Sequence, residues 1–532
     1  MERADVVVVG SGASGAAAAW ALSRRPGLRV ICLEQGERTD PAHYPATQIG
    51  WELRRQGDAS FDPNIRQALG DYPIDNSDTP ISLANFNGLG GGTILYSAHF
   101  PRFHPSDFRT RSLDGVGDDW PLTYHQLEPY FTQNEQMMGV AGLVGDPAYP
   151  EYQSLLPPVP LGPMGRKLAE GFNALGWHWW PSYAAINTRH HDGRAACANL
   201  GPCNTGCAQG AKGSVDVTYW PHALNQGVEL RTGCSVQKLL MGDDGRVGGV
   251  RYVDADGGDH ELAADFVVLA AGGAGTPRLL LNSASDRFPN GLANQSGLVG
   301  RNLMVHPLAY VEAVFDQDLR SSIGPHGCCL LSQNFYESDA ARGFARGYTL
   351  HILRGAPPLE TALGGFMTRR IPLGPGHHRA MAATFNRTAG IAVISEDLPD
   401  PANRIELDPD HRDRFGMPGV KVRYALGDNT KAMLAHGTEQ ARTVLEAAGG
   451  KVTLAFSPVR HSGWHVMGTT RMGDDPATSV VDRFGRAHGI DNLYVVDSSL
   501  FVTAGAVNPV ATAQALTLYC CDHLAKRLGP SP

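Results

Sequence analysis

At 532 residues the chain is too long for one simple hydrophobic core, which predicts two or three domains. Its 42% apolar and 18% charged residues are typical of a globular protein and exclude a disordered one. A net charge of −8 without a long Lys/Arg run argues against nucleic acids and anionic membranes as partners.

The N-terminal region predicts a cytoplasmic protein. Residues 5–9 already form a strand pattern, so no cleavable leader is expected in front of them. The apolar stretch 16–22 is too short to span a bilayer, so no membrane insertion is expected. Nine cysteines are an odd number and too few for a disulfide framework, so most are expected to be reduced thiols.

The same region carries a dinucleotide-binding pattern. Residues 6–9 are a β-branched run, typical of a strand buried on both faces of a parallel sheet. A G-x-G-x-x-G turn and a helix-forming run at 16–23 follow, and a second strand at 29–33 ends in Glu34. A Gly-rich turn without a ligand is the alternative, but the agreement of strand, helix, second strand and acid predicts dinucleotide binding.

Each glycine of this turn has a physical role. Gly10 permits the tight turn, Gly12 lets the backbone approach a pyrophosphate, and Gly15 lets the helix pack closely on the sheet. The helix N-terminus directs unpaired N–H groups at the anion. Glu34 can accept hydrogen bonds from ribose hydroxyls and would repel a 2′-phosphate, so the motif favours FAD or NAD over NADP.

The middle of the chain mixes loops, helices and strands. A second Gly-rich turn lies at 87–93, and 124–138 is predicted to be helical. The Pro-rich segment 149–165 is expected to be a surface connection. Strands are predicted at 228–235 and 247–254.

Two later segments of the chain again carry the strand and helix patterns of a nucleotide-binding domain. Residues 266–271 form a buried apolar strand followed by a helix start at Thr276-Pro277. After Lys451, a buried strand at 493–496 ends at Asp497, and a helix is predicted at 509–528.

Between residues 308 and 450 the hydrophobic pattern of the sequence changes. The alternating runs 404–407 and 420–424 predict antiparallel strands with one wet face, followed by a long helix at 429–448. The predicted fold is therefore α/β, with a discontinuous Rossmann-like domain (1–160, 214–307 and 451–532). An inserted α+β substrate-binding domain built on an antiparallel sheet covers 161–213 and 308–450.

A histidine and an asparagine near the C-terminus can carry the chemistry. His465 can accept a hydroxyl proton as hydride leaves the same carbon, and Asn508 can hold the same oxygen from another side. Asn508 also precedes Pro509 at a helix start. A satisfied core histidine and an ordinary N-cap are equally good readings of these two residues, and His461 is a nearby competitor.

Together these segments resemble the glucose–methanol–choline (GMC) family of FAD oxidoreductases over nearly the whole chain. The likeness rests on 7–34, on 90–92 with Arg102 and 105–108, on 270–272 with Thr276-Pro277, on 465–473, and on 497–514. The resemblance implies that His465 is the catalytic base and Asn508 its partner. It also implies that Asp497 holds the ribityl–pyrophosphate region of the flavin and that Val236 contacts its adenine side.

The motifs and the resemblance together give the expected FAD-binding set. Its members are Gly10, Ser11, Gly12, Ala13, Ser14, Gly15, Glu34, Gln35, Gly91, Gly92, Thr93, Ser97, Val236, Ala271, Gly272, Asp497, Pro509 and Val510. Some sugar-oxidising relatives attach FAD covalently through a His just after the second Gly-rich turn, but Ile94-Leu95-Tyr96 stands there. Non-covalent FAD is therefore expected, and neither His99 nor His104 is expected to substitute.

Within the family, the chain is most similar to bacterial pyranose or glycoside oxidases and dehydrogenases and to aminoglycoside-pathway alcohol oxidases. The segments 201–214, 473–481 and 493–496 carry this likeness. It implies oxidation of a primary or secondary hydroxyl of a sugar, glycoside or aminoglycoside-like alcohol to an aldehyde or ketone. Oxygen, a quinone and a partner redox protein are all compatible electron acceptors. The alternatives are a lyase of the hydroxynitrile type that keeps FAD without redox use, and a nucleotide-binding scaffold without catalysis.

A Gly-rich loop contains Cys197, Cys203 and Cys207. Three thiolates are enough for a three-iron cluster, and the spacing resembles that of Fe–S-coupled sugar dehydrogenases. Zinc with His190 or His191 is a further option. Soluble relatives have similar loops without iron, so bare thiols that close a tight loop are the preferred reading, and no metal is expected.

Overall fold

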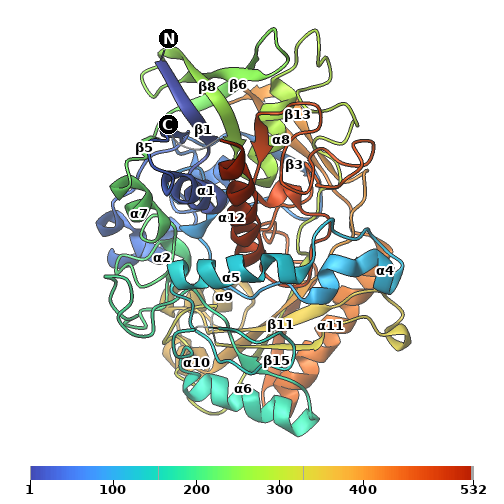
Figure 1. The fold of residues 1–532 in the computed structure, drawn as a ribbon. Helices are drawn as coiled ribbons and strands as arrows, with labels where there is room; N and C mark the ends of the chain where they lie inside the picture. Colours follow the sequence, from blue (N-terminus) through green and yellow to red (C-terminus); the bar gives the residue numbers. More distant parts are fainter. Residues whose placement is uncertain (1, 154, 328, 529–532) are drawn as a thin grey trace.

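The computed structural model describes residues 2–153, 155–327 and 329–528. Two sheets form its two halves, and a small third sheet lies beside them. The first sheet occupies the upper half of Figure 1, and β11 and β15 of the second sheet lie with α6 and α11 in the lower half. Within the described residues, no helix combines the length and the hydrophobicity that a membrane span requires.

The first sheet has the order β5-β2-β1-β8-β7-β6, with β16 paired to β8. Its strands are β1 (Glu2–Val9), β2 (Val30–Leu33), β5 (Glu229–Arg231), β6 (Ser235–Met241), β7 (Val247–Val253), β8 (Asp259–Leu269) and β16 (Leu493–Val495). The strands β5, β2, β1, β8 and β16 run parallel to one another, and β7 is antiparallel to both of its neighbours, β8 and β6. The apolar runs of β1, β2 and β16 are typical of such buried parallel strands.

The second sheet is antiparallel and has the order β15-β9-β12-β11-β10-β4. Its strands are β4 (Trp180–Pro181), β9 (Leu308–Val314), β10 (Leu330–Phe335), β11 (Tyr348–Leu353), β12 (Thr388–Ser395) and β15 (Lys451–Phe456). The third sheet consists of β3 (Ile74–Asp78), β13 (Arg404–Arg412) and β14 (Pro418–Arg423), in the order β13-β14-β3.

The helices pack on the sheets or on one another. They are α1 (Ala13–Ser23), α2 (Trp51–Arg54), α3 (Pro63–Arg66), α4 (Thr110–Asp114), α5 (Tyr124–Met138), α6 (Gly162–Leu175), α7 (Tyr219–Asn225), α8 (Gly272–Asn282), α9 (Pro358–Met367), α10 (His377–Thr384), α11 (Asp428–Ala447) and α12 (Val510–Arg527). Helix α12 packs between α1 and α5 near the centre of the molecule (Figure 1). Helix α11 packs on α6 and on β9 and β12.

Each large sheet has its own hydrophobic core. One cluster joins the first sheet to α1 and α12, and another joins the second sheet to α6 and α11. This agrees with the expected α/β fold with a second unit on an antiparallel sheet. The predicted domain boundaries stay predictions, although residues 451–456, assigned above to the nucleotide-binding domain, form β15 and pair with β9 of the second sheet.

Two sequence-based expectations need correction. The predicted strand at 228–235 is two strands, because Gly233 at φ +67° interrupts it between β5 and β6. The expected surface connection at 149–165 ends in a helix, α6, which begins at Gly162 with a proline in its first turn. The hydrophobic face of α6 lies further along the chain, where Leu168 and Phe172 are fully buried.

Candidate active site

A cavity of about 620 Å³ lies where the two large sheets face each other. The first Gly-rich turn and the ends of β1 and β2 form one wall, including Gly10 and Glu34. The second sheet contributes Leu308, Tyr310 and Ala392 to another wall. The carboxyl ends of parallel strands are the expected ligand-binding edge of such a sheet.

The two Gly-rich turns touch at the floor of this cavity. A Cβ on Gly91 would lie 2.7 Å from the Cα of Gly12, and a Cβ on Gly15 would lie 1.8 Å from the carbonyl oxygen of Gly10. Gly10 itself has φ +97°, in the left-handed region. A side chain at Gly10, Gly15 or Gly91 would therefore force the backbone to move. At Gly12 a Cβ would meet only Gly91 Cα, at 3.6 Å.

These residues fit a dinucleotide. Helix α1 begins at this turn without any side-chain cap, so its first-turn N–H groups are available to a phosphate. The Glu34 carboxylate accepts hydrogen bonds from the N–H of Ser11 at 2.8 Å, from its hydroxyl at 2.7 Å and from the N–H of Gly36 at 2.8 Å. This fixes the carboxylate at the end of β2, where it lines the cavity.

All expected FAD-binding residues except Gly15 line the cavity. Gly15 lies directly behind the turn and acts through close packing. Asp497 accepts hydrogen bonds from the N–H of Gly272 at 2.9 Å and the hydroxyl of Thr276 at 2.6 Å, so it also ties the start of α8 to the end of β16. The individual contacts with FAD stay predictions.

The structure brings His465 and Asn508 together, 43 positions apart in the chain. Asn508 Nδ2 lies 3.3 Å from His465 Nε2, and Asn508 Oδ1 is buried without a partner. His461, the competitor in the sequence, is exposed and does not line the cavity. The structure therefore places His465, and not His461, beside Asn508 in the cavity.

A second histidine, His306, determines which nitrogen of His465 is free. His306 Nε2 lies 3.1 Å and 2.9 Å from the carbonyl oxygens of Ala504 and Gly505, so Nε2 must carry a proton and donate. Burial lowers the pKa of His306 to about 4, so the ring is neutral and its Nδ1 is a bare acceptor.

His465 Nδ1 lies 2.8 Å from His306 Nδ1, so it must be the donor of that hydrogen bond. Burial, reinforced by His306, lowers the pKa of His465 well below its ordinary value, so its ring is neutral as well. Its Nε2 is then an unprotonated lone pair beside the Asn508 amide. This is the tautomer that a general base requires.

Five histidines line the cavity in all, and sequence reasoning assigned a catalytic role to only one of them. They are His99, His306, His326, His351 and His465. His99 Nε2 lies 3.3 Å from His351 Nδ1, and burial lowers the pKa of His99 to about 3 and that of His326 to about 4. No local motif marks the four histidines other than His465, because strands and loops far apart in the sequence bring them together.

Three aromatic side chains form an edge of the cavity. Trp464 and Phe61 lie with ring centroids 5.6 Å apart and line the cavity together with Phe456. Trp464 is 46% exposed, so its indole is available to a ligand.

The cysteine loop carries ordinary contacts. Cys197 Sγ accepts a hydrogen bond from the N–H of Asn199 at 3.4 Å, and Cys207 Sγ accepts one from the N–H of Lys212 at 3.5 Å. Within residues 2–153, 155–327 and 329–528, no group of three or more His, Cys, Asp or Glu side chains is arranged to hold a metal ion. These contacts suit thiols that close a loop.

Substitution of Gly12 by Ala tests the cofactor cradle. The added methyl meets only Gly91 Cα at 3.6 Å, so the chain should fold, but the methyl occupies the approach of the pyrophosphate to the α1 N-terminus. Losing one or two charge-assisted hydrogen bonds should weaken FAD binding by about 10- to 100-fold. The flavin-to-protein absorbance ratio after gel filtration measures this loss.

The matched control is Gly427→Ala. A Cβ there meets nothing within 4 Å, and the residue precedes α11, outside the cavity. It should retain the wild-type flavin content. A fully loaded Gly12→Ala protein would show that the turn does not contact the pyrophosphate.

Comparisons with known proteins identify the family of this chain. Two family profiles described as GMC oxidoreductase match residues 4–308 and 399–517. The 2-methyl-1,2-propanediol dehydrogenase of Mycolicibacterium austroafricanum is 37% identical, covering 99% of this chain and 96% of the relative. The paromamine 6′-oxidase of Streptomyces fradiae is 32% identical, covering 98% of this chain and 91% of the relative.

The fold has solved counterparts as well. The formate oxidase of Aspergillus oryzae RIB40 superposes with a TM-score of 0.70 at 17% identity, covering 99% of both chains. The profile matches cover more than half of the residues, and both curated relatives are more than 30% identical over almost their full length. The chain therefore belongs to the GMC oxidoreductases, FAD-dependent enzymes that oxidise the alcohol group of their donors.

Proposed function

We propose that this enzyme oxidises a hydroxyl of a small diol, sugar, glycoside or aminoglycoside-like alcohol to a ketone or aldehyde, with His465 as the base. The observation that carries the proposal is the unprotonated Nε2 of His465 lying 3.3 Å from the Asn508 amide inside the cofactor cavity. The relatives that act on a propanediol and on paromamine support a substrate with several hydroxyls.

In this proposal each residue has one task. Bound FAD supplies the hydride acceptor. His465 Nε2 accepts the proton of the substrate hydroxyl, and Asn508 holds the oxygen so that its C–H bond faces the acceptor. The resulting imidazolium keeps its Nδ1–H bonded to His306 Nδ1, which stabilises the positive charge in a buried site.

The cavity walls support a compact polar substrate. Trp464 and Phe61 form a partly exposed aromatic edge at the mouth, a surface on which a sugar ring or carbon chain can stack. Neutral histidines and Tyr310 line the interior, so hydroxyls are better partners there than charged groups. A pyranose-oxidase-like specificity and a cytoplasmic location belong to the same proposal.

An anaerobic substrate panel tests the proposed reaction. The holoenzyme is mixed with diols, pyranoses and aminoglycosides, and loss of the flavin absorbance is followed. Bleaching by a polyol supports the proposal. Cleavage of a cyanohydrin without bleaching would favour the lyase alternative instead. Reoxidation of the reduced flavin then identifies the acceptor. Reoxidation by air with release of hydrogen peroxide indicates oxygen, and reoxidation by an added quinone indicates a quinone. Reoxidation by neither indicates a redox protein.

Asn508→Ala should slow flavin reduction while leaving FAD bound. The amide lies beside His465 Nε2, and its removal frees the substrate oxygen to rotate away from the productive orientation. A loss of about 10- to 100-fold in the reduction rate is expected. Stopped-flow measurement under substrate saturation reports it, and an unchanged rate would remove Asn508 from the mechanism.

A further inference from the structure

The loop that leads to Asn508 is held from two sides. On one side, the Ala504 and Gly505 carbonyls accept hydrogen bonds from His306. On the other side, the N–H of Ala506 donates to the hydroxyl of Tyr336 at 3.1 Å. Asn508 follows two residues later, so its position depends on both attachments.

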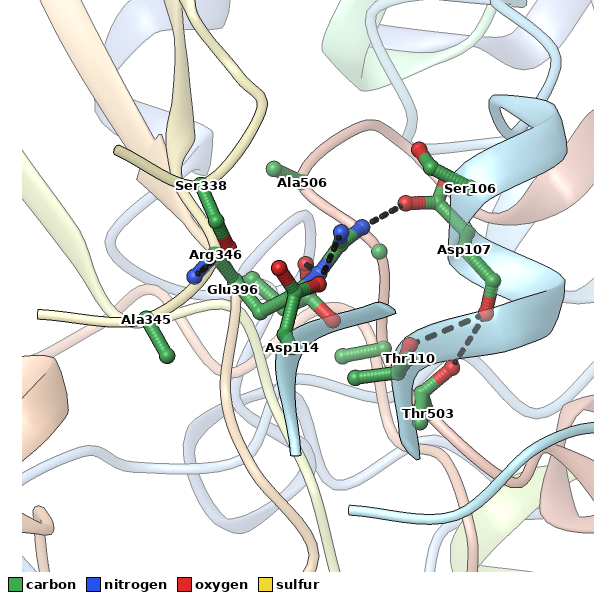
Figure 2. Close-up of polar contacts among 12 residues, drawn as sticks. Ser106, Asp107, Thr110, Asp114, Ser338, Ala345, Arg346, Glu396, Thr503 and Ala506 are labelled. Atoms are coloured by element: carbon green, nitrogen blue, oxygen red, sulfur yellow. Dashed lines mark hydrogen bonds and ion pairs between the residues drawn. The ribbon is translucent and has the colours of Figure 1, made fainter. Parts of the chain in front are cut away.

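The Tyr336 hydroxyl is itself fixed by Asp107. It donates to Asp107 Oδ2 at 2.7 Å, and Tyr336 is 1% exposed. The Asp107 carbonyl oxygen also accepts a hydrogen bond from the Thr503 hydroxyl at 3.0 Å (Figure 2). Asp107 therefore contacts the loop directly at Thr503 and, through Tyr336, at Ala506.

Asp107 in turn belongs to a buried ionic cluster around Arg346. The guanidinium contacts the carboxylates of Asp107, Asp114 and Glu396 (Figure 2), the last two at 2.9 Å. Glu337 lies 3.9 Å away on its exposed side. The Arg346 side chain is 1% exposed, and those of Asp107 and Glu396 are fully buried.

Burying the charged side chains of this cluster costs free energy. Burial raises the pKa of both Asp107 and Glu396, so keeping these carboxyls ionised beside Arg346 carries a desolvation cost. Apolar side chains of similar volume are often at least as stabilising as a buried ionic group. Apolar side chains, however, could not accept the hydrogen bond that the Tyr336 hydroxyl donates to Asp107. That bond fixes the hydroxyl oxygen that accepts from the Ala506 N–H.

We propose that Arg346, Asp107 and Tyr336 are positioning residues that hold the loop of residues 503–506 so that Asn508 meets the substrate oxygen beside His465. The inference rests on the proposed role of Asn508. None of the three contacts the substrate cavity, since all lie outside its lining. They act through the hydrogen bonds that the loop donates to the Tyr336 hydroxyl and to the Asp107 carbonyl oxygen.

Tyr336→Phe is the sharpest test, because it removes only the hydroxyl that joins Asp107 to the Ala506 N–H. In the holoenzyme, hydrogen exchange of a peptide spanning 503–508 should become about tenfold faster. Flavin reduction should slow by about tenfold at saturating substrate, with unchanged FAD content. Arg346→Met should give the same pattern, and Arg346→Lys should recover part of it by keeping the charge.

Tyr183→Phe is the matched control. Tyr183 is equally buried and donates to Asp146 at 3.2 Å, away from the loop and the cavity. It should leave both the exchange of 503–508 and the reduction rate unchanged. If Tyr336→Phe behaves like this control, the positioning role is wrong.

A double-variant cycle connects the effect to Asn508. In an Asn508→Ala background, Tyr336→Phe should cost no more than about twofold, since both changes remove the same contact. Multiplicative losses would show that Tyr336 acts by another route and would overturn the inference. If Asn508→Ala alone leaves the rate unchanged, the proposed function fails instead, and the exchange measurement still decides whether Tyr336 holds the loop.

Discussion

His465→Ala is expected to slow anaerobic flavin reduction by about 10²- to 10⁴-fold, the usual contribution of a positioned general base. The reason is geometric: Nε2 of His465 is the lone pair that His306 and the loop carbonyls leave unprotonated beside Asn508. FAD content should stay at the wild-type level, because the Gly-rich cradle is untouched. Stopped-flow absorbance with a saturating substrate measures the effect.

The control for this variant lies four positions earlier in the chain. His461 is exposed and outside the cavity, so His461→Ala should reduce its flavin at the wild-type rate. The pH dependence provides a second check. Since the pKa of His465 is lowered well below 6.5, the wild-type reduction rate should stay level from neutral pH down to mildly acidic pH and fall only at lower pH. A His465→Ala protein that reduces its flavin normally would assign the base elsewhere.

Acid should destabilise the holoenzyme steeply below about pH 6.5. Burial lowers the pKa of all five cavity histidines, so they stay neutral in the folded protein. Below about pH 6.5 the same residues bind protons in the unfolded chain but not in the folded one. Their contribution is complete above pH 6.5 and is lost as pH falls towards about 4. For His306 alone, a pKa lowered from 6.5 to about 4 corresponds to about 3 kcal/mol.

Urea unfolding between pH 7.5 and pH 4.5 measures this dependence. The free energy of unfolding should fall with a slope that reflects several protons per molecule. His351→Gln removes one of these groups while keeping a neutral polar side chain, so its slope should be shallower by about one proton. A stability that is flat across this range would mean that the cavity histidines are protonated in the fold.

The sequence predicts the fold where the signal is local. The G-x-G-x-x-G turn, the strands of the parallel sheet and the helix 124–138 each depend on neighbouring residues, and the structure agrees with them. The strand at 228–235 failed because Gly233 allows a break that periodicity does not record. The pairing of β15 with β9 was missed because residues 451–456 lie next in the chain to nucleotide-domain segments.

The candidate site divides in the same way. His465 and Asn508 stand in motifs that resemble a known family, so they could be named before their contact was seen. His306 lies 159 positions from His465, and neither position has a local pattern that indicates the pair. The role of Arg346 could not be predicted for the same reason, since its carboxylate partners come from two distant stretches of the chain, residues 107–114 and Glu396.

The position of β15 has a practical consequence for building chimaeras within the family. A graft cut at residue 450 would move β9 without its edge neighbour, leaving a row of unpaired backbone groups that invites association with other chains. Extending the exchanged block through Phe456 would carry β15 together with β9 and keep their pairing intact. The junction would then fall before His465, so the host would keep its own base.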